Sequence, residues 1–412
     1  MKKLFVNSFI LLHWFSRKKS YSGKTLKSAL LGIIIGTLAL TVILSVMNGF
    51  QLTFINAILH YDSYHIRIKG NNSEVYKLLQ SNDLIQNIFL FSEQTTLIML
   101  KKSPPIPIKL KYITEKTAHD LGLFKTITKD QSVLAIPYAI IGSELARKIN
   151  RSSSQTIQFL EFAVSEEDGI QPEIKEVELL GSFNSGYLDI DESFVFIIVP
   201  EQTLLSQKNI QTGIILKNKY DYNEIIQAIP QNLSKSLDLS IWKDYNRSFF
   251  NALQLEKNMM ILLVSIIYLV VAINIYYGLR RIIVEKYNDI ALLKAIGLTG
   301  HDVQSIVVLI GIFLGISGTL IGIFIGVITS NNINCIIRII NWLIDVLAPK
   351  TASESVKILS QNSFYLVSIP HNVLISDLVI IMVLATFFST ISAWYASFRI
   401  AYLRPSEVLR YE

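Results

Sequence analysis

Few residues of this chain have the types and spacing that a chemical site would need. The run Ser22-Gly23-Lys24-Thr25 resembles the end of a phosphate-binding loop, in which backbone amides and a lysine hold a nucleotide. That loop needs another glycine five residues before Gly23, where this chain has Lys18. The acidic run Glu166-Glu167-Asp168 offers carboxylates to a metal, but it lies beside Gly169 in a turn-like stretch. We therefore interpret the acidic run as a solvated hairpin tip.

Cysteine and histidine give no better candidate. The single cysteine, Cys335, allows neither an intrachain disulfide nor a cysteine-based metal cage. The six histidines are scattered along the chain without the spacing of metal ligands. We therefore predict a non-catalytic chain that binds no metal and no cofactor of its own.

The composition indicates a membrane protein. Of the 412 residues, 51% are hydrophobic and only 17% are charged, against roughly 25% charged in an average soluble domain. This balance excludes a disordered chain. Crossing a bilayer takes about 20 helical residues. Four apolar stretches reach that length, and they predict transmembrane helices at 28–50, 258–279, 304–330 and 377–398.

The distribution of positive charge predicts the orientation. Residues 1–27 contain seven Lys or Arg and no acid, and basic residues recur in the 280–303 loop and in the 399–412 tail. With four spans these three segments lie on one side of the membrane, which the positive-inside rule makes cytoplasmic. An apolar helical face around Phe5 and Phe9 predicts that the N-terminal segment is amphipathic and lies on the inner leaflet.

The long polar segment between the first two spans, 51–257, predicts a separate extracytoplasmic α+β domain. Strands are expected where the pattern alternates with period two or forms a short apolar run, at 64–69, 108–112, 193–199 and 213–216. Short helices are expected at 74–79 and 222–228. A long gap in the strand pattern suggests two subdomains, whose seam the sequence does not place.

Two further segments are predicted to be helical. From Trp242 to Asn258 no helix-breaking residue interrupts the chain, so we expect a stalk joined rigidly to the second span. Residues 331–376 are expected to form a periplasmic or interfacial loop. The part from Asn331 to Ala348 predicts either a re-entrant helix or an interfacial amphipathic helix that carries Arg338 and Asp345.

Glycines in the third span follow a helical repeat. Their spacings of four, three, four and four place on one helical face Gly311, Gly315, Gly318, Gly322 and Gly326. Such a face lets another helix backbone approach closely. Packing within the chain and packing against a partner subunit both explain it. The pair Thr299 and Asp302 predicts a capping box where this helix begins.

Five segments together resemble the LolC/LolE-type permeases, the membrane subunits of lipoprotein-releasing ABC transporters. The segments are Ser45–Gln51, Ile141–Ala146, Phe249–Asn258, Glu285–Gly297 and Leu403–Glu412. The wider superfamily includes MacB and FtsX. The resemblance implies an α-helical membrane protein with four transmembrane helices. It also implies a large MacB-like periplasmic α+β domain inserted between helices 1 and 2.

The resemblance further implies a set of partners in the bacterial inner membrane. A second permease subunit, either of the LolC/LolE type or a copy of this chain, pairs with it around a central cavity. Two LolD-type ATPase subunits bind the ATP and Mg that this chain does not bind. Lipoproteins leave the membrane through the cavity and pass to a LolA-type periplasmic carrier. Both termini are cytoplasmic in such permeases, and no nucleic acid is involved.

The family cavity lies between the first two spans, which implies a lipoprotein contact at their outer ends. The residues expected there are Met47, Phe50, Met259, Met260 and Leu263. Flexible Met side chains suit irregular acyl surfaces. Contact of these side chains with ordinary membrane lipid is the alternative.

The 280–303 loop resembles the coupling helix that receives the motion of the ATPase. Glu285 and Asp289 are four residues apart and are expected to share a helical face. An apolar face formed by Ile290, Leu293 and Ile296 is expected to contact the ATPase. The alternative is a surface loop whose charges are merely solvated.

The segment Gly181–Asp191 resembles the LolC form, in which a hairpin just before it contacts the carrier. The matching hairpin here is Val164–Lys175, with Ile170, Gln171 and Pro172 expected nearest its tip. A solvated turn is the alternative interpretation of that hairpin.

Two other functions are compatible with the superfamily. An FtsX-like signal transducer would control a cell-wall hydrolase and transport nothing, but such proteins have a shorter outer domain than 51–257. A MacB-like efflux subunit would carry its ATPase in the same chain, and this chain contains no nucleotide-binding loop. Lipoprotein release is therefore the favoured function.

Overall fold

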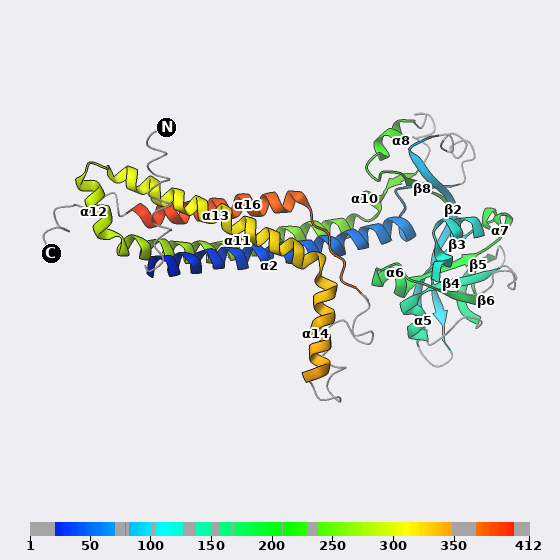
Figure 1. The fold of residues 1–412 in the computed structure, drawn as a ribbon. Coiled ribbons are helices and arrows are strands. Elements are labelled where there is room, and N and C mark those ends of the chain that lie inside the picture. The colour runs from blue at the N-terminus through cyan, green and yellow to red at the C-terminus, as the bar shows by residue number, and fades with distance from the viewer. Residues whose placement is uncertain are drawn as a thin grey trace. The chain divides into compact units, whose positions relative to one another are not determined.

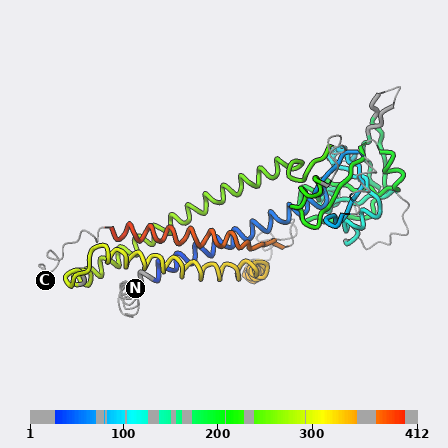
Figure 2. Tube along the Cα trace, turned by 90° about the horizontal axis from the view of Figure 1, so that it is seen from above, coloured from blue at the N-terminus to red at the C-terminus, as the bar shows by residue number. Residues whose placement is uncertain are grey.

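The computed structural model describes residues 21–70, 79, 82–100, 104–126, 137–149, 156–165, 169–207, 209–228, 238–347 and 368–398. The 399–412 tail, most of the expected amphipathic N-terminal segment and most of the expected helix 74–79 lie outside these residues. The chain divides into two compact units, of which the first is Met1–Gln51 with Leu253–Glu412 and the second is Leu52–Ala252. The first unit consists of long helices and the second is rich in strands (Figures 1 and 2).

Four of the described helices are long and apolar enough to cross a membrane. They are α2 (Tyr21–Ala57), α11 (Arg247–Glu285), α13 (Gly300–Asn331) and α16 (Ile375–Ser397). The shorter helices α12 (Tyr287–Ala295) and α14 (Ile333–Leu347) precede and follow α13. The predicted fold class, with four membrane-crossing helices and a β-rich domain between the first two, is confirmed.

The helices that contain the first two expected spans extend beyond them. Helix α2 includes the expected span 28–50, runs to Ala57 and continues as a π-helix, η1 (Ile58–Asp62). No Gly or Pro interrupts the chain between Gln51 and Asp62, so nothing local ends the helix there. The expected unbroken stalk is interrupted instead: α10 (Trp242–Tyr245) ends at Asn246, and α11 starts at the next residue. The Asn246 side chain donates to the carbonyl of Trp242 at 3.2 Å, a local bond that competes with helix continuation.

The glycine face of α13 packs against two helices of the same chain. Side chains of α2 lie against Gly318, Gly322 and Gly326, where an added Cβ would meet Ile33, Thr37 and Thr41 respectively. Residues of α16 lie against Gly311 and Gly315, where an added Cβ would meet Ala393 and Ser389. The Thr299–Asp302 capping box is present at the N-terminus of α13. The close approach that small residues permit is thus used within this chain.

The described strands of the second unit form one sheet in the order β3-β7-β4-β6-β5-β2-β8-β1-β9. Their bounds are β1 Ile66–Lys69, β2 Ile85–Met99, β3 Ile106–Ile113, β4 Tyr138–Gly142, β5 Thr156–Ser165, β6 Gly169–Phe183, β7 Phe194–Ile198, β8 Ile210–Leu216 and β9 Leu239–Ile241. Strands β3 and β7 pair in parallel, as do β4 and β6, and the other pairs are antiparallel. All four expected strand regions coincide with β1, β3, β7 and β8.

An additional pairing of β3 with β2 closes six of these strands into a ring, and β8, β1 and β9 extend from it. Strand β2 belongs to both parts, because its residues 85–92 pair with β8 and its residues 91–98 pair with β3. Each part has its own core: Phe91, Phe183 and Phe196 are buried in the ring, and Ile66, Ile214 and Ile225 under the extension. The seam between the two subdomains therefore lies within β2.

The described helices of the second unit are short. They are α4 (Glu115–Asp120), η2 (Leu123–Thr126), α5 (Ser143–Ile149), α6 (Leu188–Ser193), α7 (Glu201–Leu205), α8 (Tyr222–Ala228) and α10. Helix α8 covers the predicted helix 222–228.

Candidate functional site

The segment that leads from helix α2 into the sheet has an unusual backbone. The π-helix η1 is followed by Ser63 and then by Tyr64, whose φ of 53° is the only positive value for a non-glycine in the described part of the chain. The Tyr64 ring is fully buried, 5.5 Å from the Phe89 ring and 5.0 Å from the Phe91 ring. It also lies against Gly213, where a side chain would overlap it. Aromatic packing thus holds a strained residue at the start of β1.

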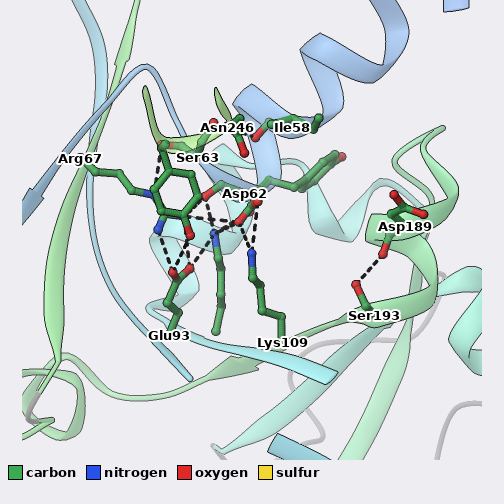
Figure 3. A network of polar contacts seen from close by, with 12 residues as sticks. Ile58, Asp62, Ser63, Arg67, Glu93, Lys109, Asp189, Ser193 and Asn246 are labelled. Carbon is green, nitrogen blue, oxygen red and sulfur yellow. Dashed lines mark hydrogen bonds and ion pairs between the residues drawn. The ribbon is translucent and has the colours of Figure 1, made fainter. Parts of the chain in front are cut away.

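Five charged side chains surround this turn: Asp62, Arg67, Glu93, Lys109 and Lys111 (Figure 3). We call them the joint cluster. Arg67 forms a fork with Glu93, with N–O distances of 2.7 and 3.2 Å, and its Nε donates to the Ser63 carbonyl. Lys109 donates to both Asp62 oxygens at 3.1 and 3.3 Å.

Lys111 is the most enclosed member of the joint cluster. Its side chain is 0% exposed, and its ammonium donates to the carbonyls of Tyr61 and Asp62 at 2.9 and 2.6 Å. It also lies 3.7 Å from Asp62 Oδ1 and 3.6 Å from Glu93 Oε2. A lysine in the sheet thereby fixes the C-terminal carbonyls of the π-helix.

Tyr245 of α10 closes the joint cluster from another direction. Its hydroxyl donates to Glu93 at 3.1 Å, and its ring centre lies 3.9 Å from the guanidinium carbon of Arg67. A guanidinium over an aromatic face is an attractive arrangement. The segment that follows α2 and the segment that precedes α11 therefore meet on the same charges. The joint cluster connects both to strands β1, β2 and β3.

The charges perturb one another strongly. Burial alone would raise the pKa of Glu93, but Lys111, Arg67 and Lys109 together lower it to about 2. Burial, reinforced by the Arg67 charge, lowers the pKa of Lys111 to about 7, against the opposing pull of Asp62 and Glu93. Three cations face two carboxylates, so loss of the Lys111 proton balances the charge. The joint cluster does not pair a nucleophile with a base. Its ion pairs hold separate segments of the domain together.

A cavity of about 430 Å³ opens beside the joint cluster. Its polar lining includes Asp62, Lys109, Asp189, Ser193 and Asn246 (Figure 3). The cavity leaves Lys109 partly solvated, with 31% of its side chain exposed. No group of His, Cys, Asp and Glu among the described residues could hold a metal ion.

In the membrane unit, the Ser45–Gln51 motif joins three segments at one end of the helices. The Ser45 hydroxyl lies 2.5 Å from that of Ser330 on α13, and the Ser45 carbonyl accepts from the Asn372 amide at 2.8 Å. Asn48 donates to Asp377 of α16 at 2.5 Å. A side chain at Gly49 would collide with the backbone of residues 370–371. The motif is explained by these contacts between α2, α13 and the start of α16.

The five expected cavity residues lie on α2 and α11. Met47, Phe50 and Met260 are half-buried, whereas Met259 and Leu263 are exposed. Gln51 of α2 reaches Glu256 of α11 at 3.4 Å, and farther from this end Val271 and Asn274 of α11 contact Gly36 and Gly32 of α2. The five side chains are therefore at a similar level, at the end of the helices nearest the inserted domain in sequence.

A helix is present in the expected coupling segment, but its buried and exposed sides differ from those expected. Helix α11 ends at Glu285 and α12 begins at Tyr287, so Glu285 and Asp289 do not share one helix, and Asp289 pairs with Lys286 at 2.9 Å. Ile290 is 0% exposed because it packs into the core formed by α2, α11, α13 and α16.

The exposed apolar residues of this segment are Leu292 and Ile296, and Ile296 is 73% exposed. Ile290, which was expected on the apolar face, is thus covered by neighbouring helices, whereas Leu292 and Ile296 are accessible. The side chain of Leu293 lies outside the described residues. Gly297, with a φ of 111°, ends the turn after α12, as expected.

The expected carrier hairpin is formed by β5 and β6. Ser165 pairs with Gly169, and residues 166–168 between them lie outside the described residues. Ile170, Gln171 and Pro172 pair with Val164, Ala163 and Phe162 in the strands, and Pro172 is exposed. The three residues therefore belong to the start of β6, directly after Gly169.

Two other motifs converge on Asp191. Its carboxylate is fully buried and accepts twice from the Ser185 amide, at 2.8 and 3.0 Å. Gly142 lies against the backbone of Asp191 with no room for a side chain. Burial raises the pKa of Asp191 to about 6, although the Ser185 bonds oppose the shift. The Ile141–Ala146 and Gly181–Asp191 segments thus have a shared structural role.

The sequence did not reveal the joint cluster. Arg67 and Lys111 belong to alternating strands, in which polar residues normally face water. Here those charges are buried, under η1 and α10. The available signal was the charge balance, since both strands carry only cations and therefore require carboxylates from elsewhere.

Comparison with known proteins places this architecture in context. Residues 261–405 match the family model described as FtsX-like permease C-terminal. The lipoprotein-releasing system transmembrane protein LolC of Xylella fastidiosa is 24% identical, over 93% of this chain and 93% of the relative. LolC of Buchnera aphidicola subsp. Schizaphis graminum is 28% identical, over 78% of this chain and 82% of the relative. LolE of Haemophilus influenzae is 23% identical, over 93% of each.

A solved structure of the periplasmic region of MacB from Actinobacillus actinomycetemcomitans also matches, at 10% identity. It covers 45% of this chain and 92% of that chain with a TM-score of 0.28, which is too low to carry a functional inference. The resemblance that the five sequence segments indicated is confirmed by the sequence relatives. This chain is similar to the LolC and LolE transmembrane proteins along nearly its whole length, and its residues 261–405 match the FtsX-like permease C-terminal family.

Proposed function

We propose that this chain is the permease subunit of an ABC transporter that extracts lipoproteins from the inner membrane and passes them to a periplasmic carrier. The observation that carries the proposal is similarity over 93% of the chain to proteins named for a lipoprotein-releasing system. The four membrane-crossing helices and the inserted domain support it. The chain itself is non-catalytic, and a separate ATPase of the LolD type supplies ATP hydrolysis.

Energetics explain why such a subunit needs an ATPase. A lipoprotein with three acyl chains of about sixteen carbons is anchored by tens of kcal/mol, at roughly 0.8 kcal/mol per buried CH₂. The ATPase moves α12 through the exposed residues Leu292 and Ile296. Because α2 and α11 both continue into segments held by the joint cluster, displacement of either helix is transmitted to the sheet. In the proposed orientation, which the basic flanking segments favour, α12 is cytoplasmic and the inserted domain is periplasmic, where the β5–β6 hairpin meets the carrier.

The lipoprotein occupies the space beside the outer ends of α2 and α11, shared with a second permease subunit. Met259 and Leu263 are exposed there, and the polarisable Met side chains adapt to acyl chains. Ordinary lipid contact would expose the same residues, so the test must separate a lipoprotein from bulk lipid.

Photo-crosslinking in the intact membrane makes that separation. A photoreactive amino acid at Met47 or Met259 is expected to capture a lipoprotein, and capture is expected to fall when ATP is added. The matched control is Val383, an exposed residue of α16, where capture should be weak and independent of ATP. Equal capture at all three positions, or none at Met47 and Met259, would contradict the proposal.

A further inference from the structure

Helix α14 has a separation of polar and apolar residues that the proposed function does not use. Its four polar residues are spaced by four, three and four, so they form one stripe: Asn334, Arg338, Asn341 and Asp345. Every other position of Ile333–Leu347 is apolar. Fifteen residues at 1.5 Å each make a helix of about 22 Å, which is too short to cross a hydrocarbon core of about 30 Å.

No described residue of the chain covers most of the apolar side of α14. Ile339, Trp342, Val346 and Leu347 are all more than half exposed, and Leu347 reaches 79%. Within α14 only Ile337 is buried. A contiguous apolar surface of this kind marks an interaction site.

The position of α14 identifies what covers that surface. The membrane-crossing helix α13 ends at Asn331, and α14 begins two residues later. The Asn334 side chain donates to the Ile369 carbonyl at 3.1 Å and accepts from the Ile369 amide at 2.8 Å. The same short segment, through Asn372, bonds to Ser45 of α2. Asn334 is thus tied to the level at which α13 ends and α16 begins.

Within the membrane unit, α14 runs crosswise to the long helices: Figure 1 shows it from the side, and Figure 2 shows it end-on. A helix that is crosswise to the spans lies along the membrane plane. Phe324 and Ile328 of α13, the preceding helix, are also exposed apolar residues, and they face lipid if α13 crosses the bilayer.

We propose that α14 is a lipid-binding interfacial helix in the leaflet on the side of the inserted domain. Its apolar residues enter the acyl region, and the exposed polar residues Arg338 and Asp345 face the headgroups and water. Trp342 flanks the stripe, at the boundary where indole rings concentrate in membranes. Helices of this pattern insert about 5–10 Å into the headgroup and acyl boundary. The proposal requires that the four helices span a membrane, but not that the transported substrate is a lipoprotein.

Site-directed spin labelling of the full chain in phospholipid nanodiscs tests the proposal. Because Cys335 is the single cysteine, a Cys335→Ser background accepts one new cysteine at a time, at Leu343, at Leu347 or at Arg338. Collision of each label is measured with oxygen, which partitions into lipid, and with a nickel chelate, which stays in water. Labels at Val383 of α16 and at Lys217, an exposed residue of the inserted domain, provide the deep and aqueous references.

Labels at Leu343 and Leu347 are expected to show an oxygen-to-nickel collision ratio several-fold above that at Lys217 and below that at Val383. The label at Arg338 is expected to remain accessible to nickel. Nickel accessibility at Leu343 and Leu347 equal to that at Lys217 would overturn the proposal and place α14 in water. Shielding of both labels from both reagents would also overturn it, because a protein surface would then cover the helix.

A second measurement requires no substitution. A fluorophore on native Cys335, which is exposed, is expected to be quenched by lipids brominated near the glycerol and much less by lipids brominated at the chain ends. Absence of quenching by either lipid would contradict the proposal even if a labelled variant had failed to fold.

Discussion

The buried carboxylate of Glu93 should stabilise the inserted domain in a measurable way. It accepts two bonds from Arg67 and one from Tyr245, and it lies 3.6 Å from Lys111. Lowering its pKa from 4.5 to about 2 corresponds to about 3 kcal/mol of stability near neutral pH, at 1.36 kcal/mol per pKa unit. Glu93→Gln removes that charge and leaves the fully buried Lys111 and Arg67 with one carboxylate. We expect destabilisation of about 3–5 kcal/mol, the range for breaking a buried ion pair.

Hydrogen exchange of the full chain in nanodiscs measures this loss locally. Amides of β2 and β3 in Glu93→Gln are expected to exchange at least about a hundredfold faster than in the parent, since each tenfold change is about 1.4 kcal/mol. The matched control is Glu173→Gln, which removes an exposed carboxylate from β6 in the same sheet and should leave the exchange rates unchanged.

The pH dependence provides an independent check on Glu93. Its pKa in the folded state is below its unfolded value, so its contribution is complete above about pH 4.5 and is lost as the pH falls toward 2. The parent should therefore lose protection over that window, and Glu93→Gln should lose much less. Parent-like exchange in Glu93→Gln at pH 7 would refute the account of the joint cluster as a coupled set of charges.

Three further outcomes follow from the structure. Gly322→Ala should destabilise the membrane unit by about 1–3 kcal/mol through overpacking against Thr37, and thermal unfolding of Gly322→Ala combined with Thr37→Ala should show partial recovery; an unchanged melting temperature in the single variant would refute this. The folded-state pKa of Asp191 is raised to about 6, so the stability of the domain should fall as the pH rises from about 4 to 6. Asp191→Asn should flatten this pH dependence of the melting temperature, and an unaltered dependence would exclude this carboxyl as its source. Ile296→Asp should weaken co-purification with the ATPase at normal yield, whereas Ile290→Asp should lower the yield by burying a charge; full ATPase binding by Ile296→Asp would exclude that residue from the contact.

The membrane-crossing helices could be predicted from sequence because each is encoded locally. About twenty apolar residues suffice to identify a span, and the capping pair Thr299 and Asp302 marks the start of α13 within four residues. The same holds for α8 and for the expected strand regions, where alternation or a short apolar run is enough.

The features that the sequence missed depend on contacts between distant segments. Arg67 and Lys111 alternate with apolar residues like solvent-facing charges, and only the arrival of η1 and α10 buries them. Ile290 and Ile296 are both apolar residues of one short segment, yet the neighbouring helices cover the first and leave the second exposed. The break at Asn246 also depends on a side-chain bond that competes weakly with the helix.

The shared strand β2 has a consequence for biosynthesis. Strand β1 pairs only with β8 and β9 among the described strands, and both are encoded after the whole six-stranded ring. In the order of synthesis, β1 therefore has neither of these partners until β8 has been made. Strand β9 then completes the edge immediately before α10 and α11. The extension is therefore the last part of the sheet that can form, and its last strand is made immediately before the second long helix.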